Sequence, residues 1–111
     1  MIEQEQFAEN IRQAGMAVRD AEEEACIMEA AEKSTFAKLQ VEALAMGYKT
    51  VAAQTTYADA HEKMFEARLN RGTAKASIAA AKANLLAAEV EFKVWQTQMA
   101  TMRQERRVYG S

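Results

Sequence analysis

The sequence has no proline, four glycines, one histidine and a single cysteine among its 111 residues. Without proline no helix break is obligatory, and without a second cysteine no internal disulfide can form, which fits a reducing compartment. The acidic start MIEQEQFAEN is unlike a secretory signal, and no apolar run approaches the roughly 20 residues of a membrane span. We therefore expect a cytoplasmic protein without membrane contact.

Signatures of catalysis and metal binding are missing as well. The histidine, His61, has Phe65 where a zinc-protease helix needs its second histidine, and Glu29-Ala-Ala-Glu32 lacks the Glu-x-x-His pairing of di-iron bundles. Cys26 has no neighbouring base to activate it, and there is no glycine-rich phosphate loop. We expect no enzyme activity, no cofactor and no metal, with His61 either exposed or capping a helix.

What the chain does contain is strong helix formers, because Ala, Glu, Lys, Gln, Arg, Met and Leu dominate its composition. Two places could interrupt a helix, where Gly47 or Gly72 would take the C′ position and Thr50 or Thr73 would cap the next helix. We favour a turn at Gly72 and leave Gly47 open, since an isolated glycine is also tolerated within a helix. The expected single domain, residues 1–111, has helices at about 3–46, 49–70 and 73–108.

Apolar side chains in the last third alternate at spacings of four and three, the heptad pattern of a helix-packing seam. The large ones are Ile78, Leu85, Phe92, Trp95, Met99 and Met102, with Ala74, Ala81 and Ala88 between them. A similar frame near the N-terminus runs from Phe7 to Met28, and a four-residue stutter at Glu32 joins it to the rest. We interpret the pattern as core packing or an oligomer seam, not as a ligand site.

A second apolar stripe lies nearly opposite the first on a helical wheel. Its large members are Val51, Phe65, Leu69, Leu86 and Val90. A helix with two apolar faces must be covered on both, and a chain of this length has few helices with which to do so. The sequence therefore predicts an all-α fold, either an elongated antiparallel helical hairpin or a three-helix coiled-coil-like bundle, that forms a homo-oligomer.

Charge is distributed unevenly along the chain. Residues 1–46 hold ten acidic and four basic residues, whereas residues 73–111 hold three acidic and six basic ones. The basic end carries the candidate contact residues, which are Lys93, Arg103, Arg106, Arg107 and Tyr109. The arginines could stabilise the helix dipole, pair with the acidic first helix, or grip the phosphates of single-stranded nucleic acid while Tyr109 or Trp95 stacks on a base.

The segments FKVWQTQMAT (92–101) and ERRVYG (105–110), together with KTVAAQ (49–54), resemble small helical proteins of phage and prophage early regions. Such proteins are often encoded near recombination functions, such as single-strand annealing proteins and exonucleases. The resemblance implies a phage accessory protein in the cytoplasm of a bacterial host cell, and it transfers no site residues.

Three functions are hypotheses at this point. The first is a phage-encoded, non-enzymatic helical adaptor that associates with itself, binds an unidentified protein and is accessory to DNA recombination. The second is a single-stranded nucleic-acid-binding protein that uses the basic C-terminal end. The third is an inhibitor of a host defence complex, whose acidic residues would block a cationic surface: Glu22, Glu23, Glu24 and Glu29.

Overall fold

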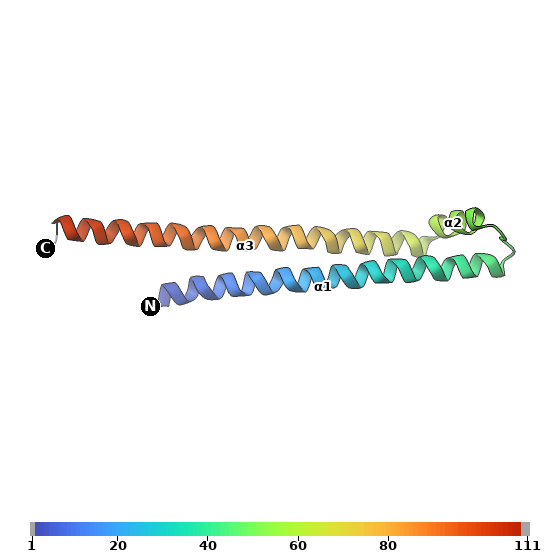
Figure 1. The fold of residues 1–111 in the computed structure, drawn as a ribbon, viewed down its shortest axis with the longest axis horizontal. Helices are drawn as coiled ribbons and strands as arrows, with labels where there is room; N and C mark the ends of the chain where they lie inside the picture. The colour runs from blue at the N-terminus through green and yellow to red at the C-terminus, as the bar shows by residue number, and fades with distance from the viewer. Residues whose placement is uncertain (1, 110–111) are drawn as a thin grey trace. The chain divides into compact units, whose positions relative to one another are not determined.

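The computed structural model describes residues 2–109 and consists of three α-helices joined by short connections (Figure 1). Helix α1 spans Ile2–Ala45, α2 spans Val51–Ala60, and α3 spans Glu62–Tyr109. No β-strand occurs among these residues, so the predicted all-α class is confirmed. The expected domain also included residues 1, 110 and 111, which lie outside the described residues. None of the three helices, over residues 2–109, is long and apolar enough to cross a membrane.

A turn at Gly47 ends α1. Gly47 has φ +103°, a conformation that glycine adopts at little cost because it has no Cβ. The Tyr48 N–H donates to the Ala43 carbonyl at 3.0 Å, and the Gly47 N–H donates to the Leu44 carbonyl at 3.1 Å. These are the two hydrogen bonds of a Schellman motif, which satisfy carbonyls that the end of a helix otherwise leaves unpaired.

The turn that we favoured at Gly72 is wrong, because α3 passes through this residue without a break. Thr73 does not cap a helix either; its carbonyl accepts from the Ser77 hydroxyl at 3.1 Å within α3. Seam residues before and after the glycine are buried, with Met64 1% and Ala74 6% exposed. This packing offsets the cost of about 1 kcal/mol that glycine imposes relative to alanine in a helix. The expected helices 49–70 and 73–108 are thus replaced by α2 and α3.

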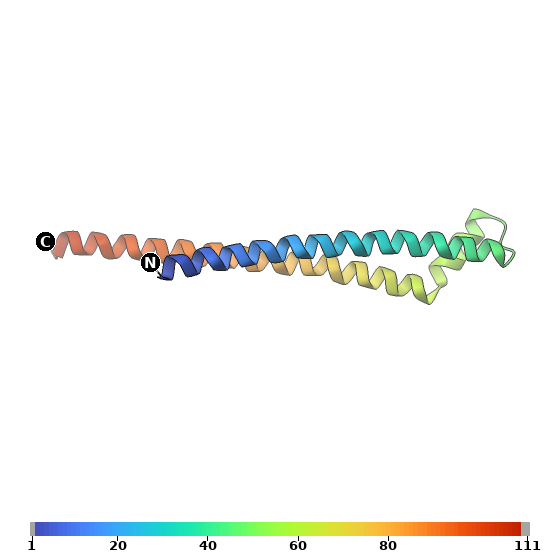
Figure 2. The same ribbon diagram turned by 90° about the horizontal axis from the view of Figure 1, so that it is seen from below.

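The break falls instead at His61, between α2 and α3, where Figure 2 shows the ribbon changing direction. His61 has extended backbone (φ −78°, ψ 139°), and its N–H donates to the Ala58 carbonyl at 3.1 Å. Its Nδ1 accepts from the Lys63 N–H at 3.1 Å, so His61 caps the start of α3, one of the two roles expected of it. Thr50 caps α2, because its Oγ1 accepts from the Ala53 N–H at 3.1 Å.

The chain divides into two compact units, and α1 and α3 each contribute to both. Unit 1 comprises Met1–Arg19 and Ala80–Ser111, and unit 2 comprises Asp20–Ala79. Among the described residues of unit 1 only Ala81 is almost fully buried, at 8% exposure. Unit 1 is therefore held mainly by half-buried side chains.

The buried cluster that joins the three helices in unit 2 takes one residue from each helix. Leu39 of α1 is 3% exposed, Ala58 of α2 is 0% exposed and Met64 of α3 is 1% exposed. Two aromatic residues, Phe36 and Tyr57, pack partly buried against this cluster. In unit 2, therefore, the short helix α2 is packed onto the pair formed by α1 and α3.

Candidate protein-interaction surface

Most of the predicted seam residues of α3 are used inside the chain. Those that are half-buried within their own unit are Ile78 in unit 2 and Leu85, Phe92, Trp95 and Met99 in unit 1. Met102 differs, since 44% of its surface is exposed. These half-buried residues are therefore packing residues, as the heptad pattern indicates, and are not free to bind a second chain.

Three aromatic rings join α1 and α3 within unit 1. The Phe7 ring centroid lies 5.9 Å from that of Phe92 and 5.5 Å from that of Trp95, at distances typical of attractive aromatic pairs. Trp95 Nε1 also donates to Glu3 Oε2 at 2.8 Å. Because Trp95 is engaged in this way, it fastens the first turn of α1 to α3 and is not a free surface for base stacking.

Glu32, at the stutter of the α1 frame, faces two arginines of α3 in unit 2. The Glu32 side chain is 17% exposed, with Oε2 2.7 Å from Arg71 Nε and Oε1 4.0 Å from Arg68 Nε. Oε2 receives no well-directed hydrogen bond, so the short contact is an ion pair between close charges. Sequence analysis missed this pair, although Glu32 and Arg71 are polar exceptions of opposite charge in the seam.

The second predicted apolar stripe is exposed. Val51, on α2, is 71% exposed. Four members lie on α3, two in each unit, and we call these exposed pairs the outer face of α3. In unit 2, Phe65 and Leu69 are 66% and 57% exposed; in unit 1, Leu86 and Val90 are 62% and 49% exposed. Single exposed apolar side chains are common, but within each unit two large ones lie four residues apart, one helical turn, which makes an apolar surface suited to binding a protein. The outer face of α3 is therefore the candidate interaction surface.

The basic C-terminal end of α3 is exposed in unit 1. Lys93, Arg103, Arg106 and Arg107 are all exposed, and Tyr109 is 87% exposed. Within residues 2–109 no carboxylate lies at ion-pair distance from these four cations, so the pairing with the acidic first helix is absent there. Arg106 and Arg107 lie in the last turn of α3, where their positive charges interact favourably with the negative end of the helix dipole and stabilise the helix.

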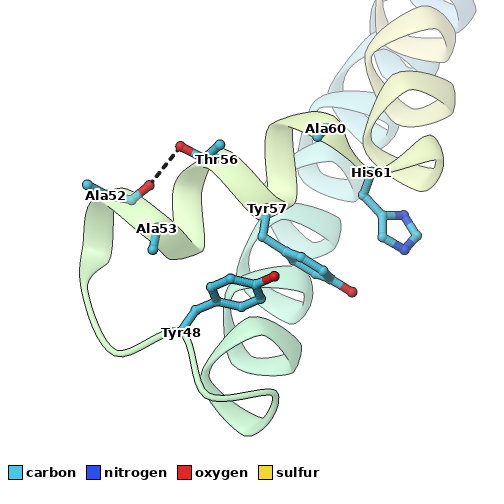
Figure 3. Close-up of a pocket in the computed structure, with 7 residues that line it drawn as sticks. All are labelled: Tyr48, Ala52, Ala53, Thr56, Tyr57, Ala60 and His61. Atoms are coloured by element: carbon cyan, nitrogen blue, oxygen red, sulfur yellow. Dashed lines mark hydrogen bonds between the residues drawn. The ribbon is translucent and has the colours of Figure 1, made fainter.

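An open pocket of about 580 Å³ lies in unit 2 beside α2 (Figure 3). The rings of Tyr48, Tyr57 and His61 follow one another there at centroid distances of 5.7 and 5.8 Å. Burial of Tyr57, together with its hydrogen bond to Glu42, raises the pKa of its phenol above the ordinary value of 10.0. The other lining residues are Ala52, Ala53, Thr56 and Ala60. Sequence analysis missed the pocket, because Tyr48 reaches α2 only through the turn at Gly47.

The part of the chain that the structure describes contains no cluster of three or more His, Cys, Asp or Glu side chains suited to a metal ion. Cys26 is a free, exposed thiol on α1 in unit 2. It lines a hollow of about 410 Å³ together with Glu22, Glu29 and Lys75, side chains of both charges. The described His, Cys, Asp and Glu side chains thus form no metal-type cluster, whereas α3 exposes large apolar side chains in each unit.

No family model, no curated protein and no solved structure matches the chain.

Proposed function

We propose that the chain is a non-enzymatic helical interaction protein that associates with itself and serves as an adaptor for another protein. The observation that carries the proposal is the outer face of α3, where each of the two units exposes a pair of large apolar side chains, 49–66% exposed. Removing apolar surface from water contributes about 25 cal/mol per Å². Because α1 and α2 leave these side chains exposed, a partner is needed to obtain that stabilisation.

The small core supports the same proposal. Among the described residues six side chains are almost fully buried, and four of them belong to alanine. Leu39 and Met64 are the two large ones, and both lie in unit 2. Chains with so little buried apolar volume commonly depend on association for their stability.

Light scattering over a wide range of protein concentration tests self-association. We expect a mass above that of the 12.4 kDa chain, falling on dilution. Leu69→Glu should reduce the mass to that of one chain, because a carboxylate buried without a partner costs several kcal/mol. Asn70→Glu is the matched control, because it adds the same charge at the next, also exposed, position, beside the outer face of α3. A wild-type chain that stays monomeric at every concentration contradicts the proposal.

The resemblance to phage early-region proteins supports a place for the adaptor among recombination functions in a bacterial host cell. On that basis we propose a single-strand annealing protein or an exonuclease as the class of partner. A tagged chain should retain a purified protein of this class on an affinity resin. If the Leu69→Glu chain still retains the partner, the partner binds another surface. If neither a single-strand annealing protein nor an exonuclease is retained, the proposed link to recombination is wrong.

A second function, binding of single-stranded nucleic acid, is favoured by the exposed arginines at the end of α3. Their charge is free to meet phosphates, and Tyr109 offers an exposed ring to a base. Binding of a labelled oligonucleotide should then weaken steeply with salt, and Arg103→Ala/Arg107→Ala should reduce that slope. Lys33→Ala/Lys38→Ala removes the same charge from α1 and is the control. No binding at low salt would leave the arginines as partner or dipole contacts.

A further inference from the structure

We infer that the pocket beside α2 is a binding site for a small organic cation of the quaternary ammonium class. The pocket lies entirely within unit 2, and its lining comes from the turn after α1, from α2 and from the break at His61. The inference goes beyond the proposed function, because it concerns a small ligand and does not depend on self-association.

Three aromatic rings line one side of the pocket (Figure 3). The Tyr48 and Tyr57 centroids lie 5.7 Å apart with ring planes inclined by 35°, and the Tyr57 and His61 centroids lie 5.8 Å apart with planes inclined by 58°. Because each plane is inclined to the next, the rings form a curved wall and not a flat stack. The face of an aromatic ring is negative, so a cation within about 6 Å of the ring centroids is attracted to such a wall.

Small side chains of α2 leave the space beside these rings. Ala52, Thr56 and Ala60 recur every four residues and therefore lie along one face of the helix. The Thr56 hydroxyl donates to the Ala52 carbonyl at 3.0 Å, so it is already bonded within α2. The resulting volume of about 580 Å³ lies within the range of about 300–1,000 Å³ that is usual for small-molecule sites.

The charges at the pocket favour a cation over an anion. Tyr57 donates a hydrogen bond to Glu42, which makes the phenol ring more electron-rich and places a carboxylate next to the aromatic wall. No Lys or Arg is among the residues that line the pocket, and the nearby Lys49 and Lys63 are exposed and lie outside the lining. A cation therefore gains attraction from both the rings and the carboxylate, with no positive side chain in the lining to oppose it.

Two ligands of the same shape and different charge test the inference. One is choline, and the other is the neutral alcohol in which carbon replaces the choline nitrogen. His61 is the chain's single histidine, so the NMR signals of its ring C–H protons report on this pocket. In slightly alkaline buffer of constant ionic strength, we expect choline to shift these signals with a dissociation constant of about 1 mM, roughly fivefold below that of the alcohol. Equal or tighter binding of the alcohol, or no saturable shift with choline, overturns the inference.

Tyr48→Leu tests the aromatic wall. Tyr48 is 43% exposed, and the carbonyl of residue 48 that accepts from Gln54 Nε2 is retained, so the turn should persist. We expect the affinity for choline to fall about threefold and that for the alcohol to change little. Tyr109→Leu removes an exposed ring in unit 1 and is the matched control. Equal losses for the two ligands would mean that the pocket binds apolar groups regardless of charge, which overturns the inference.

Glu42→Gln tests the carboxylate, because it removes the charge and keeps an acceptor for the Tyr57 hydroxyl. We expect the affinity for choline to fall about threefold and that for the alcohol to stay the same. Glu66→Gln, the same change at an exposed position of α3 in unit 2, should alter neither affinity. Circular dichroism checks that every variant keeps its helices. If choline binds the Tyr48→Leu and Glu42→Gln chains as tightly as the wild type, it binds elsewhere and the inference is wrong.

Phosphatidylcholine vesicles distinguish a free ion from a lipid head group, because they carry the same ammonium group beside a phosphate. That phosphate would approach the Glu42 carboxylate, so we expect the chain not to co-sediment with the vesicles. Co-sedimentation that Tyr48→Leu abolishes would assign the pocket to a membrane surface and overturn a free ion as its ligand.

Discussion

Glu32 is an acidic residue at the apolar seam of α1. Two arginines on α3, Arg68 and Arg71, lie beside it and explain its position. Its side chain is 17% exposed, whereas those of Arg68 and Arg71 are 44% and 51% exposed. The carboxylate is thus the more desolvated partner, and the guanidinium groups retain contact with water. An uneven pair of this kind contributes more than a surface ion pair and less than a fully buried one.

We expect Glu32→Ala to lower the free energy of unfolding by about 1 kcal/mol, because Arg71 loses its close carboxylate. Glu29→Ala is the matched control on the same helix. Glu29 pairs with Lys33 at 3.8 Å, and the two side chains are 55% and 79% exposed, so its loss should be near zero. Urea unfolding of both variants, at low and high salt, measures the difference. Equal losses would show that Glu32 contributes no more than a surface charge.

The phenol of Tyr57 gives the stability of unit 2 a dependence on alkaline pH. Burial and the hydrogen bond to Glu42 raise its pKa in the folded chain above the ordinary 10.0. The folded state therefore holds this proton more tightly, so the contribution is full below about pH 10 and is lost as the pH rises through the folded pKa. Unfolding measured from pH 8 to 11 should show this decline for the wild type and a smaller decline for Tyr57→Phe. Identical profiles would contradict the assignment.

At the scale of the element, the two glycines singled out in the sequence have opposite roles. Gly47 has φ +103° and ends α1, whereas Gly72 lies within α3. Their local sequences are alike, each with a threonine soon after, so local signals could not separate them. The difference arises from packing, since Ala74 just beyond Gly72 is 6% exposed while Tyr48 just beyond Gly47 is 43% exposed.

Alanine substitutions at the two glycines should change stability in opposite directions. Gly72→Ala should stabilise the chain by about 0.5–1 kcal/mol, because alanine costs less than glycine within a helix. Gly47→Ala should destabilise it by about 1 kcal/mol or more, because the left-handed conformation opposes a Cβ. Neither new Cβ would meet another atom within 4 Å, so the contrast isolates the backbone. Thermal melting of both variants measures it, and shifts of equal sign would contradict the two conformations.

The break at His61 could not be predicted, although its cap could. The residues around His61 were enough to predict that it would either cap a helix or stay exposed, and His61 Nδ1 does accept from the Lys63 N–H. That the helix should end there depends on Ala58, which is 0% exposed in the core with Leu39 and Met64. Contacts between residues distant in sequence made that choice, and the local pattern does not contain them.

At the scale of the whole chain, the heptad frame predicted which side of each long helix packs inward. The half-buried or buried positions of α1 include Phe7, Ile11, Val18 and Met28, all in the predicted frame. A seven-residue period is a property of sequence alone, so the inward side could be read without a structure. The pocket at Tyr48, Tyr57 and His61 could not, because it depends on the turn at Gly47 and the break at His61.

If the chain associates with itself, its thermal stability depends on its concentration. A folded chain is stabilised by about 2.7 kcal/mol when its partner is present at 100 times the dissociation constant. We therefore expect the melting temperature of the wild type to rise with protein concentration and that of Leu69→Glu to stay constant. Calorimetry at several concentrations measures both. A wild-type melting temperature that does not move would mean that the outer face of α3 stays uncovered.

The hydrogen bond from Trp95 to Glu3 also bears on the order in which the chain folds. It joins residues 92 apart in sequence, whereas the core contact between Leu39 and Met64 closes a loop of about 25 residues. Closing the longer loop first would cost about 1 kcal/mol more in chain entropy. We therefore expect folding to start in unit 2 and unit 1 to close last, when the ends of α1 and α3 are already held near each other and the remaining loop closure costs less entropy. Opening follows the reverse order, so amide hydrogens near the two ends exchange before those around Met64.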